Sequence, residues 1–112
     1  MPIQEWSERI WVVQLGNEPL LSEDLRGLKE RVEQARQAPD MVLDFSGVSQ
    51  INSSNLSQLL RLRKLAVDRD VKLRLTGPPN SVWAVFLTTG LDKVFEFVTD
   101  VPTALAGLQM NH

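Results

Sequence analysis

Residues 41–62 read MVLDFSGVSQINSSNLSQLLRL, and this stretch decides how the rest of the chain is interpreted. It opens with an apolar run, Met41 to Leu43, which favours a strand covered on at least one face. The small and polar residues DFSG follow, and a leucine-rich helical pattern begins after them. The stretch therefore predicts a strand, a short loop and a helix.

The polar segment NSSN, residues 52–55, contains the predicted start of that helix. The side-chain oxygen of Asn52 can accept the backbone N–H of residue 54 or 55, which makes Asn52 the expected N-cap. Ser53 and Ser54 then fall in the first turn, where unpaired N–H groups and the positive end of the helix dipole lie. We expect function to be located here, although an ordinary helix start explains the same residues.

The rest of the chain alternates between strand and helix patterns. Strands are expected near residues 3–6 and at 10–15, 41–45, 71–75 and 94–98. Helices are expected with N-caps at Ser22, Asn52, and Asn80 or Ser81, and at residues 102–108, with Gly90 closing the third. In the first helix one apolar stripe recurs at Leu21, Leu25, Leu28, Val32 and Ala35. The pattern predicts an α/β domain with a mixed sheet, because two early strands joined by a short connection pair antiparallel.

Length and composition agree with one small domain spanning residues 1–112. The net charge of −2 gives no electrostatic reason to expect nucleic acid or an anionic membrane as a partner. The N-terminus lacks the basic and apolar regions of a signal peptide, and no apolar run approaches the ~18–20 residues of a membrane helix. A cytoplasmic protein is expected.

Residue types needed for most enzyme chemistry are scarce. The absence of cysteine excludes disulfides, thiolate catalysis and cysteine metal sites. The only histidine is His112, so a Ser-His-Asp arrangement or a histidine metal cluster is not expected. Neither of the common phosphate-binding glycine motifs occurs. We therefore expect no enzymatic activity, no metal, no cofactor and no small-molecule substrate.

Two segments carry a resemblance to a known family. The string LDFSGVSQINSSNLSQLLRLRK, residues 43–64, resembles the centre of STAS domains of the anti-sigma factor antagonist type, with their D-hydrophobic-S-G-V and I-D-S-[ST]-G-L motifs. Residues 85–95, VFLTTGLDKVF, look like a second block of the family, in the right order. The chain departs from the pattern at two positions, because the family's Asp is Asn52 here and its Gly is Asn55.

The resemblance implies a fold, a partner and a site. The implied fold is a mixed sheet of four to five strands with about four helices packed mainly on one side. The implied function is binding to a kinase-type anti-sigma factor, and a homodimer is left open. Ser53 corresponds to the family's phosphorylated serine, and Ser54 is the second choice. The expected partner-binding residues are Asn52, Ser53, Ser54, Asn55, Leu56, Gln58 and Leu59.

Physical chemistry explains why such a phosphate would act on binding rather than on folding. Phosphorylation adds about −1.5 to −2 charges, and a helix N-terminus tolerates them. A partner surface that fits a neutral hydroxyl would have to desolvate a dianion. The two departures weaken the analogy, because Asn52 lacks a charge and Asn55 adds a side chain that we expect to hinder the partner's approach.

Two alternatives belong to other classes of protein. One is an accessory STAS subunit of a transporter or signalling complex, which would use the same surface without phosphorylation. The other is a small enzyme or nucleotide-binding domain, for which the sequence offers little chemistry. The basic residues Arg61, Arg63, Lys64, Arg69, Lys72 and Arg74 are expected to form a solvated surface, with contact to an acidic partner as the alternative.

Overall fold

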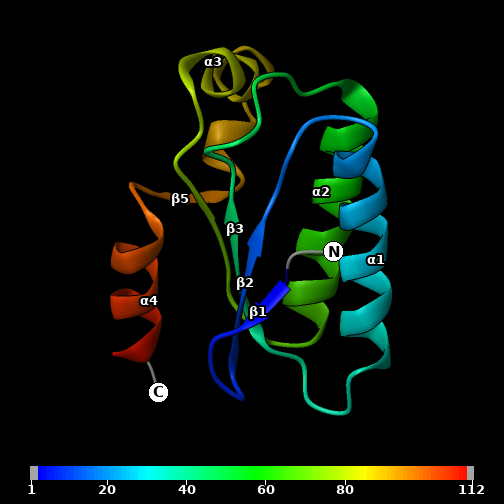
Figure 1. The fold of residues 1–112 in the computed structure, drawn as a ribbon, viewed down its shortest axis with the longest axis vertical. Helices are drawn as coiled ribbons and strands as arrows, with labels where there is room; N and C mark the ends of the chain where they lie inside the picture. The colour runs from blue at the N-terminus through cyan, green and yellow to red at the C-terminus, as the bar shows by residue number, and fades with distance from the viewer. Residues whose placement is uncertain (1–2, 111–112) are drawn as a thin grey trace.

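A computed structural model describes residues 3–110 of the chain. Strands alternate with helices along most of the sequence (Figure 1). In order, the elements are β1 (Ile3–Glu5), β2 (Ile10–Gln14), α1 (Leu20–Gln34), β3 (Asp40–Asp44), α2 (Ser53–Asp68), β4 (Leu73–Thr76), α3 (Asn80–Thr89), the 3-10 turn η1 (Leu91–Lys93), β5 (Glu96–Val98) and α4 (Val101–Gln109).

The five strands form one mixed sheet in the order β1-β2-β3-β4-β5. Strand β1 pairs antiparallel with β2, with Ile3 opposite Val13. The remaining pairs are parallel, so that Leu43 of β3 lies between Val13 and Leu75. Parallel neighbours require crossover connections, and α1, α2 and α3 provide them. The predicted mixed α/β sheet is confirmed.

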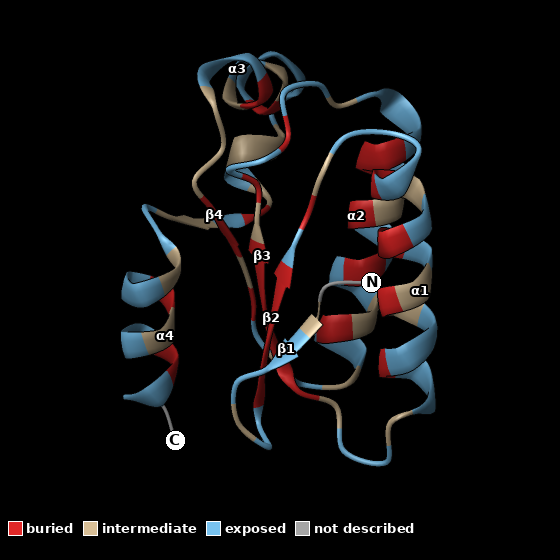
Figure 2. Cartoon of the chain, viewed as in Figure 1, coloured by how far each residue is buried: buried red, intermediate tan, exposed pale blue. Residues whose placement is uncertain are grey.

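The sheet is covered on both faces, which explains the apolar run in β3. Alternate residues such as Val13, Leu43 and Leu75 belong to the main core with α1, α2 and α3. The intervening Val12 and Val42 pack in a smaller cluster on the other face. Figures 1 and 2 show α1 and α2 side by side on one face and α4 alone on the other. Most helices therefore pack on one side, as expected, with α4 as the exception.

Helix α1 begins earlier than the sequence indicated. Its first residue is Leu20 and its N-cap position is Pro19, so Ser22 is not the N-cap. The side chain of Glu18 accepts hydrogen bonds from the backbone N–H and the hydroxyl of Ser22, and this takes the place of a serine cap. The predicted apolar stripe is confirmed for Leu21, Leu25, Leu28 and Val32, which are all buried. Its fifth member, Ala35, is the C-cap of α1 and only half-buried.

Other element starts differ from the predictions by one or two residues. The amide of Val71 bonds to the Ala66 carbonyl at the end of α2, and that of Lys72 bonds to the Asp40 carboxylate, so β4 starts only at Leu73. Strand β5 starts at Glu96, because the two preceding amides bond to the Leu91 carbonyl. At α3, backbone bonds to Pro79 replace the expected Asn80 or Ser81 cap.

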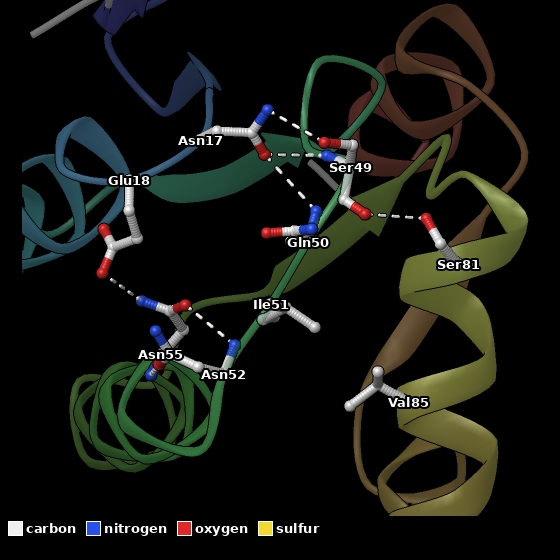
Figure 3. A pocket seen from close by; sticks show the side chains of 9 residues that line it. All are labelled: Asn17, Glu18, Ser49, Gln50, Ile51, Asn52, Asn55, Ser81 and Val85. Carbon is white, nitrogen blue, oxygen red and sulfur yellow. Dashed lines mark hydrogen bonds between the residues drawn. The ribbon is translucent and has the colours of Figure 1, made fainter.

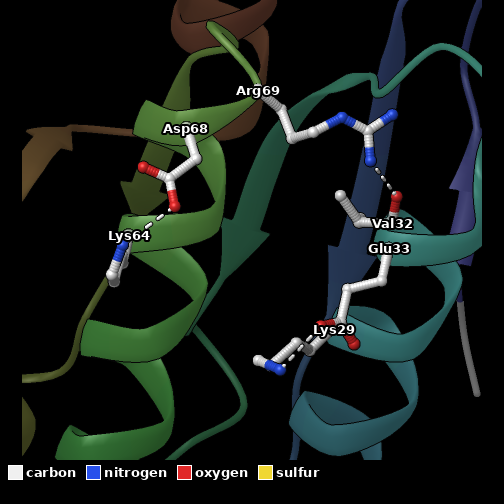
Figure 4. A network of polar contacts seen from close by, with 6 residues as sticks. All are labelled: Lys29, Val32, Glu33, Lys64, Asp68 and Arg69. Atoms are coloured by element: carbon white, nitrogen blue, oxygen red, sulfur yellow. Dashed lines mark hydrogen bonds and ion pairs between the residues drawn. The ribbon is translucent and has the colours of Figure 1, made fainter.

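Arg69 fixes the ends of α1 and α2 relative to each other (Figure 4). Its guanidinium donates to the carbonyl oxygens of Val32 and Ala35, at 3.0 and 2.7 Å, and so satisfies the C-terminus of α1. On the exposed side of α2, Lys64 pairs with Asp68 at 2.9 Å. Part of the predicted basic surface therefore has a structural role.

Candidate functional site

The N-terminus of α2 is closed by a reciprocal pair of asparagines. Asn52 is extended (φ −114°, ψ 173°), and its side-chain oxygen accepts the backbone N–H of Asn55 at 2.8 Å. In return, the Asn52 backbone N–H donates to Oδ1 of Asn55 at 3.0 Å. This is a capping box in which asparagine replaces the usual Glu or Gln at the third helical position. The predicted N-cap is confirmed, with residue 55 as its partner.

The two asparagines make the capping bonds, and the hydroxyls of the serines between them stay free. Ser53 and Ser54 are the first two residues of α2, and both are exposed. Neither hydroxyl makes a hydrogen bond within residues 3–110. Two hydroxyls thus lie at the carboxyl end of the sheet, beyond its central strand.

The loop at residues 45–52 is held in place from two sides (Figure 3). Asn17 accepts the Ser49 backbone N–H at 2.8 Å and donates to the Ser49 hydroxyl at 3.0 Å. The Ser81 hydroxyl of α3 donates to the Ser49 carbonyl at 2.8 Å. These contacts were not predicted from the sequence, where Gly16-Asn17 indicates only a turn and Ser81 was expected only as a possible N-cap. These bonds give the loop a defined conformation before any partner binds.

Two glycines allow the segments around this loop to approach closely. A Cβ atom on Gly47 would lie 3.0 Å from the Leu15 carbonyl oxygen. Gly77 has φ +63° and lies next to Ser46, where a Cβ atom would be 3.6 Å from the Ser46 side chain. Asp44 then fixes the turn by accepting the Ser46 backbone N–H at 2.9 Å. The D-F-S-G segment is therefore the turn that leads the chain from β3 towards α2.

Asn55 lies inside the protein, contrary to our expectation. Its side chain is fully buried and points at α1, where its amide is 3.3 Å from the Ser22 hydroxyl and 3.5 Å from the Glu18 carboxylate. Gln58, half-buried, donates to the Ser22 carbonyl at 3.0 Å. The idea that Asn55 obstructs a partner is thus wrong, because the side chain extends the capping box into a contact between α1 and α2.

The seven residues predicted to bind a partner divide into two groups. Asn55, Leu56 and Leu59 are buried and support the helix from within. Asn52, Ser53 and Ser54 are exposed, and Gln58 is partly so. Only the second group can contact another protein directly.

Glu18 is the one titratable side chain near the asparagine pair whose pKa is perturbed. Hydrogen bonds from the Ser22 hydroxyl, and next from the Ser22 backbone N–H, hold the pKa of Glu18 below its ordinary value of 4.5. Burial opposes this effect, and the amides of Asn55 and Asn52 add to it. The carboxylate is therefore ionised at neutral pH and acts as an acceptor.

Beside the asparagine pair lies an open pocket of about 590 Å³ between the β2–α1 loop, the β3–α2 loop and α3 (Figure 3). It is lined by Asn17, Glu18, Ser49, Gln50, Ile51, Asn52, Asn55, Ser81 and Val85. Apart from Ile51 and Val85, these side chains offer hydrogen bonds, but the set contains no paired nucleophile and base.

Two further findings concern metal binding and membranes. No group of three or more potential metal ligands occurs within residues 3–110, and His112 lies outside the described residues. In the same range, no helix combines the length and apolar character that crossing a membrane needs.

Comparisons with solved structures identify the same fold. A proposed anti-sigma factor antagonist from Thermotoga maritima superposes with a TM-score of 0.81 at 15% identity, covering 96% of this chain and 93% of the other. The anti-sigma factor antagonist SpoIIAA in its unphosphorylated form gives 0.79 at 15% identity, covering 96% and 94%. A sulfate transporter family protein from Wolinella succinogenes gives 0.74 at 15% identity, covering 91% and 84%.

A comparison with curated proteins finds no match. The comparison with family models is more specific, because the STAS domain model matches residues 5–104. That match runs from the first strand to the last helix and includes the whole β3–α2 segment. Together with the mixed sheet and the capped helix after its central strand, it means that the chain belongs to the STAS domain family.

Proposed function

We propose that this chain, as one STAS domain, is a cytoplasmic anti-sigma factor antagonist that binds a kinase-type anti-sigma factor. The binding surface comprises the loop at residues 45–52 and the exposed residues of the first turn of α2. The names of two structural neighbours support this type of function. The chain contributes a preformed surface and no catalytic group, and the kinase partner supplies the ATP.

The observation that carries the proposal is the free, exposed hydroxyl of Ser53 at the first position of α2. Asn52 and Asn55 already satisfy the capping bonds, so Ser53 is not needed for the fold. A residue at this place can change its charge without a loss of internal contacts. Phosphorylation of Ser53 is therefore proposed as the switch that releases the partner.

The physical effect of a phosphate on Ser53 falls mainly on the complex. The group adds about −1.5 to −2 charges next to free backbone N–H groups, which favour an anion. The free protein thus keeps its fold. In the complex the same charge must lose water or find a cation, and a partner surface built for a hydroxyl offers neither.

The test compares three single substitutions by calorimetric titration with purified kinase-type anti-sigma factors from the same genome. Ser53→Asp is expected to weaken binding at least about tenfold, or about 1.4 kcal/mol, while Tm stays within about 2 °C of the wild type. Ser53→Ala is expected to bind normally. Gln37→Glu is a control that adds the same charge to an exposed loop at the opposite end of the sheet. Equal binding by Ser53→Asp and Gln37→Glu would reject the switch.

A second candidate function keeps the same surface but omits the phosphate. The sulfate transporter family neighbour suggests an accessory STAS subunit, and Asn52 lacks the carboxylate that this type of antagonist carries before its serine. Intact mass spectrometry of the protein from its native cells separates the two functions. An antagonist is expected to show a population with one added phosphate on Ser53, whereas an accessory subunit would show none and would co-purify with transporter components.

A further inference from the structure

A second groove, between α1 and α2, carries an unusual concentration of positive charge. It has a volume of about 340 Å³ and is lined by Leu25, Arg26, Lys29, Ser54, Gln58 and Arg61. Three of these six side chains are cationic and none is acidic. A groove of this composition favours an anion.

The cations in the groove have little internal compensation. Arg26 and Arg61 form no ion pair within residues 3–110. Lys29 pairs with Glu33 at 3.0 Å, but both side chains are well exposed, at 35% and 46%. An exposed pair of this kind contributes little to stability, so Lys29 can turn to a stronger anion. Arg26 and Arg61 therefore offer two guanidinium groups, unpaired within residues 3–110, to an anion in the groove, with Lys29 beside them.

Helix geometry places Ser54 at this groove and directs Ser53 away from it. Ser54, Gln58 and Arg61 follow one another at spacings of four and three, so they share one face of α2. That face meets α1, because Gln58 bonds to the Ser22 carbonyl. By the same spacing, Ser53 lies above Ser57 and Leu60, which carry no charge.

Both helices direct the cations towards Ser54. Side chains on a helix lean towards its N-terminus, so Arg61 extends back along α2 in the direction of Ser54. On α1, Arg26 and Lys29 lie four and seven residues after Ser22, on the face that bonds to α2. Ser54 thus lies at the end of the groove nearest the N-terminus of α2, and both α1 and α2 contribute cations to the groove.

We propose that this groove binds a phosphoryl group carried by Ser54 of the same chain. A partner kinase would transfer it from ATP. The Ser54 oxygen bonds to the γ-phosphorus, the bond from that phosphorus to ADP breaks, and the hydroxyl proton passes to a base of the kinase. The two guanidinium groups then donate hydrogen bonds to the phosphate, and Lys29 adds a compact charge.

This inference deepens the proposed function, because it adds a second acceptor to the same helix turn with a different consequence. A phosphate on Ser53 faces solvent and the partner. A phosphate on Ser54 is held between α1 and α2 and joins the two helices. Modification of Ser54 would therefore stabilise the free domain and leave the Ser53 surface uncharged.

The test installs phosphoserine during translation at position 54 or 53 of the full chain, so that no kinase is needed. Phosphorus NMR then follows the titration of each phosphate, whose second pKa is ordinarily about 6. The pKa of the phosphate at 54 is expected to lie at least about one pH unit below that at 53, because nearby cations favour the dianion. Tm is expected to rise more with the phosphate at 54 than with the phosphate at 53, where only the helix N-terminus favours the charge.

Charge removal supplies the controls. The double substitution Arg26→Gln with Arg61→Gln is expected to abolish both the difference in pKa and the difference in Tm between the two phosphorylated forms. Arg36→Gln, at an exposed position beyond the end of α1 and outside the groove, should change neither. Identical titrations at 53 and 54, or a difference that survives the double substitution, would overturn the inference. Because the phosphate is installed directly, this result is independent of whether a kinase partner exists.

Discussion

The buried Asn55 offers the sharpest test of how the site is built. Asn55→Ala removes the Oδ1 atom that accepts the Asn52 backbone N–H at 3.0 Å. It also removes the amide that lies 3.3 Å from Ser22 and 3.5 Å from Glu18. The helix keeps the opposite half of the capping box, because the Asn55 backbone N–H still donates to Asn52.

The magnitude follows from these contacts. A donor that loses its partner in a partly buried setting costs about 1–3 kcal/mol. The two amide contacts are long and add little. Alanine is a better helix former than asparagine, which recovers about 0.5 kcal/mol. The expected loss of unfolding free energy is therefore about 1–2 kcal/mol, or about 4–8 °C in Tm for a domain of this size.

Urea unfolding followed by tryptophan fluorescence measures this difference. Two-state analysis should give a lower midpoint with an unchanged slope. Ser57→Ala is the matched control, since Ser57 is exposed in the next turn of α2, and it should stay within about 0.5 kcal/mol of the wild type. If Asn55→Ala were as stable as Ser57→Ala, the asparagine pair would not be what holds the start of α2 against α1.

Two further predictions concern the neighbours of Asn55. Asn52→Asp should leave the free energy of unfolding within about 0.5 kcal/mol of the wild type, because both residues are good N-caps. The same substitution should raise the rate at which a cognate kinase phosphorylates Ser53, as measured in a radiolabel assay. An unchanged rate would mean that the missing carboxylate does not limit the reaction. Glu18 has a pKa below 4.5 in the folded state, so its contribution is present above that pH and is lost as the pH falls through the folded pKa. Glu18→Gln should therefore be less stable than the wild type at neutral pH and nearly as stable as the wild type in acid. Urea unfolding at both pH values measures this. A difference in unfolding free energy that persists in acid would exclude the carboxylate as its cause.

Much of the fold could be predicted from local pattern alone. The alternation of β4 and the stripe of α1 each report which face is buried, and the Asn52 cap depends on residues only three apart. The position of α4 was harder to predict. A signal for it existed in β2, where Ile10 to Val13 are apolar without interruption, which indicates that both faces of that strand are covered.

What the sequence could not show was the direction of Asn55. Its partners Glu18 and Ser22 lie 37 and 33 residues earlier in the chain, so no local pattern connects them. Ser22 also looked like an N-cap, since serine followed by two acidic residues is typical of a helix start. The structure instead places Ser22 inside α1, where Glu18 accepts hydrogen bonds from its backbone N–H and its hydroxyl.

In the functions that we propose, the first turn of α2 separates folding from signalling by assigning them to different residues. The two asparagines at positions 52 and 55 make the capping bonds, so that the hydroxyls of the serines at 53 and 54 are not needed for the cap. Adjacent residues on a helix point about 100° apart, so the two hydroxyls meet different surroundings. Ser53 faces solvent above uncharged residues, while Ser54 faces the cations between α1 and α2. The same chemical modification would thus weaken a complex at one position and stabilise the free domain at the next.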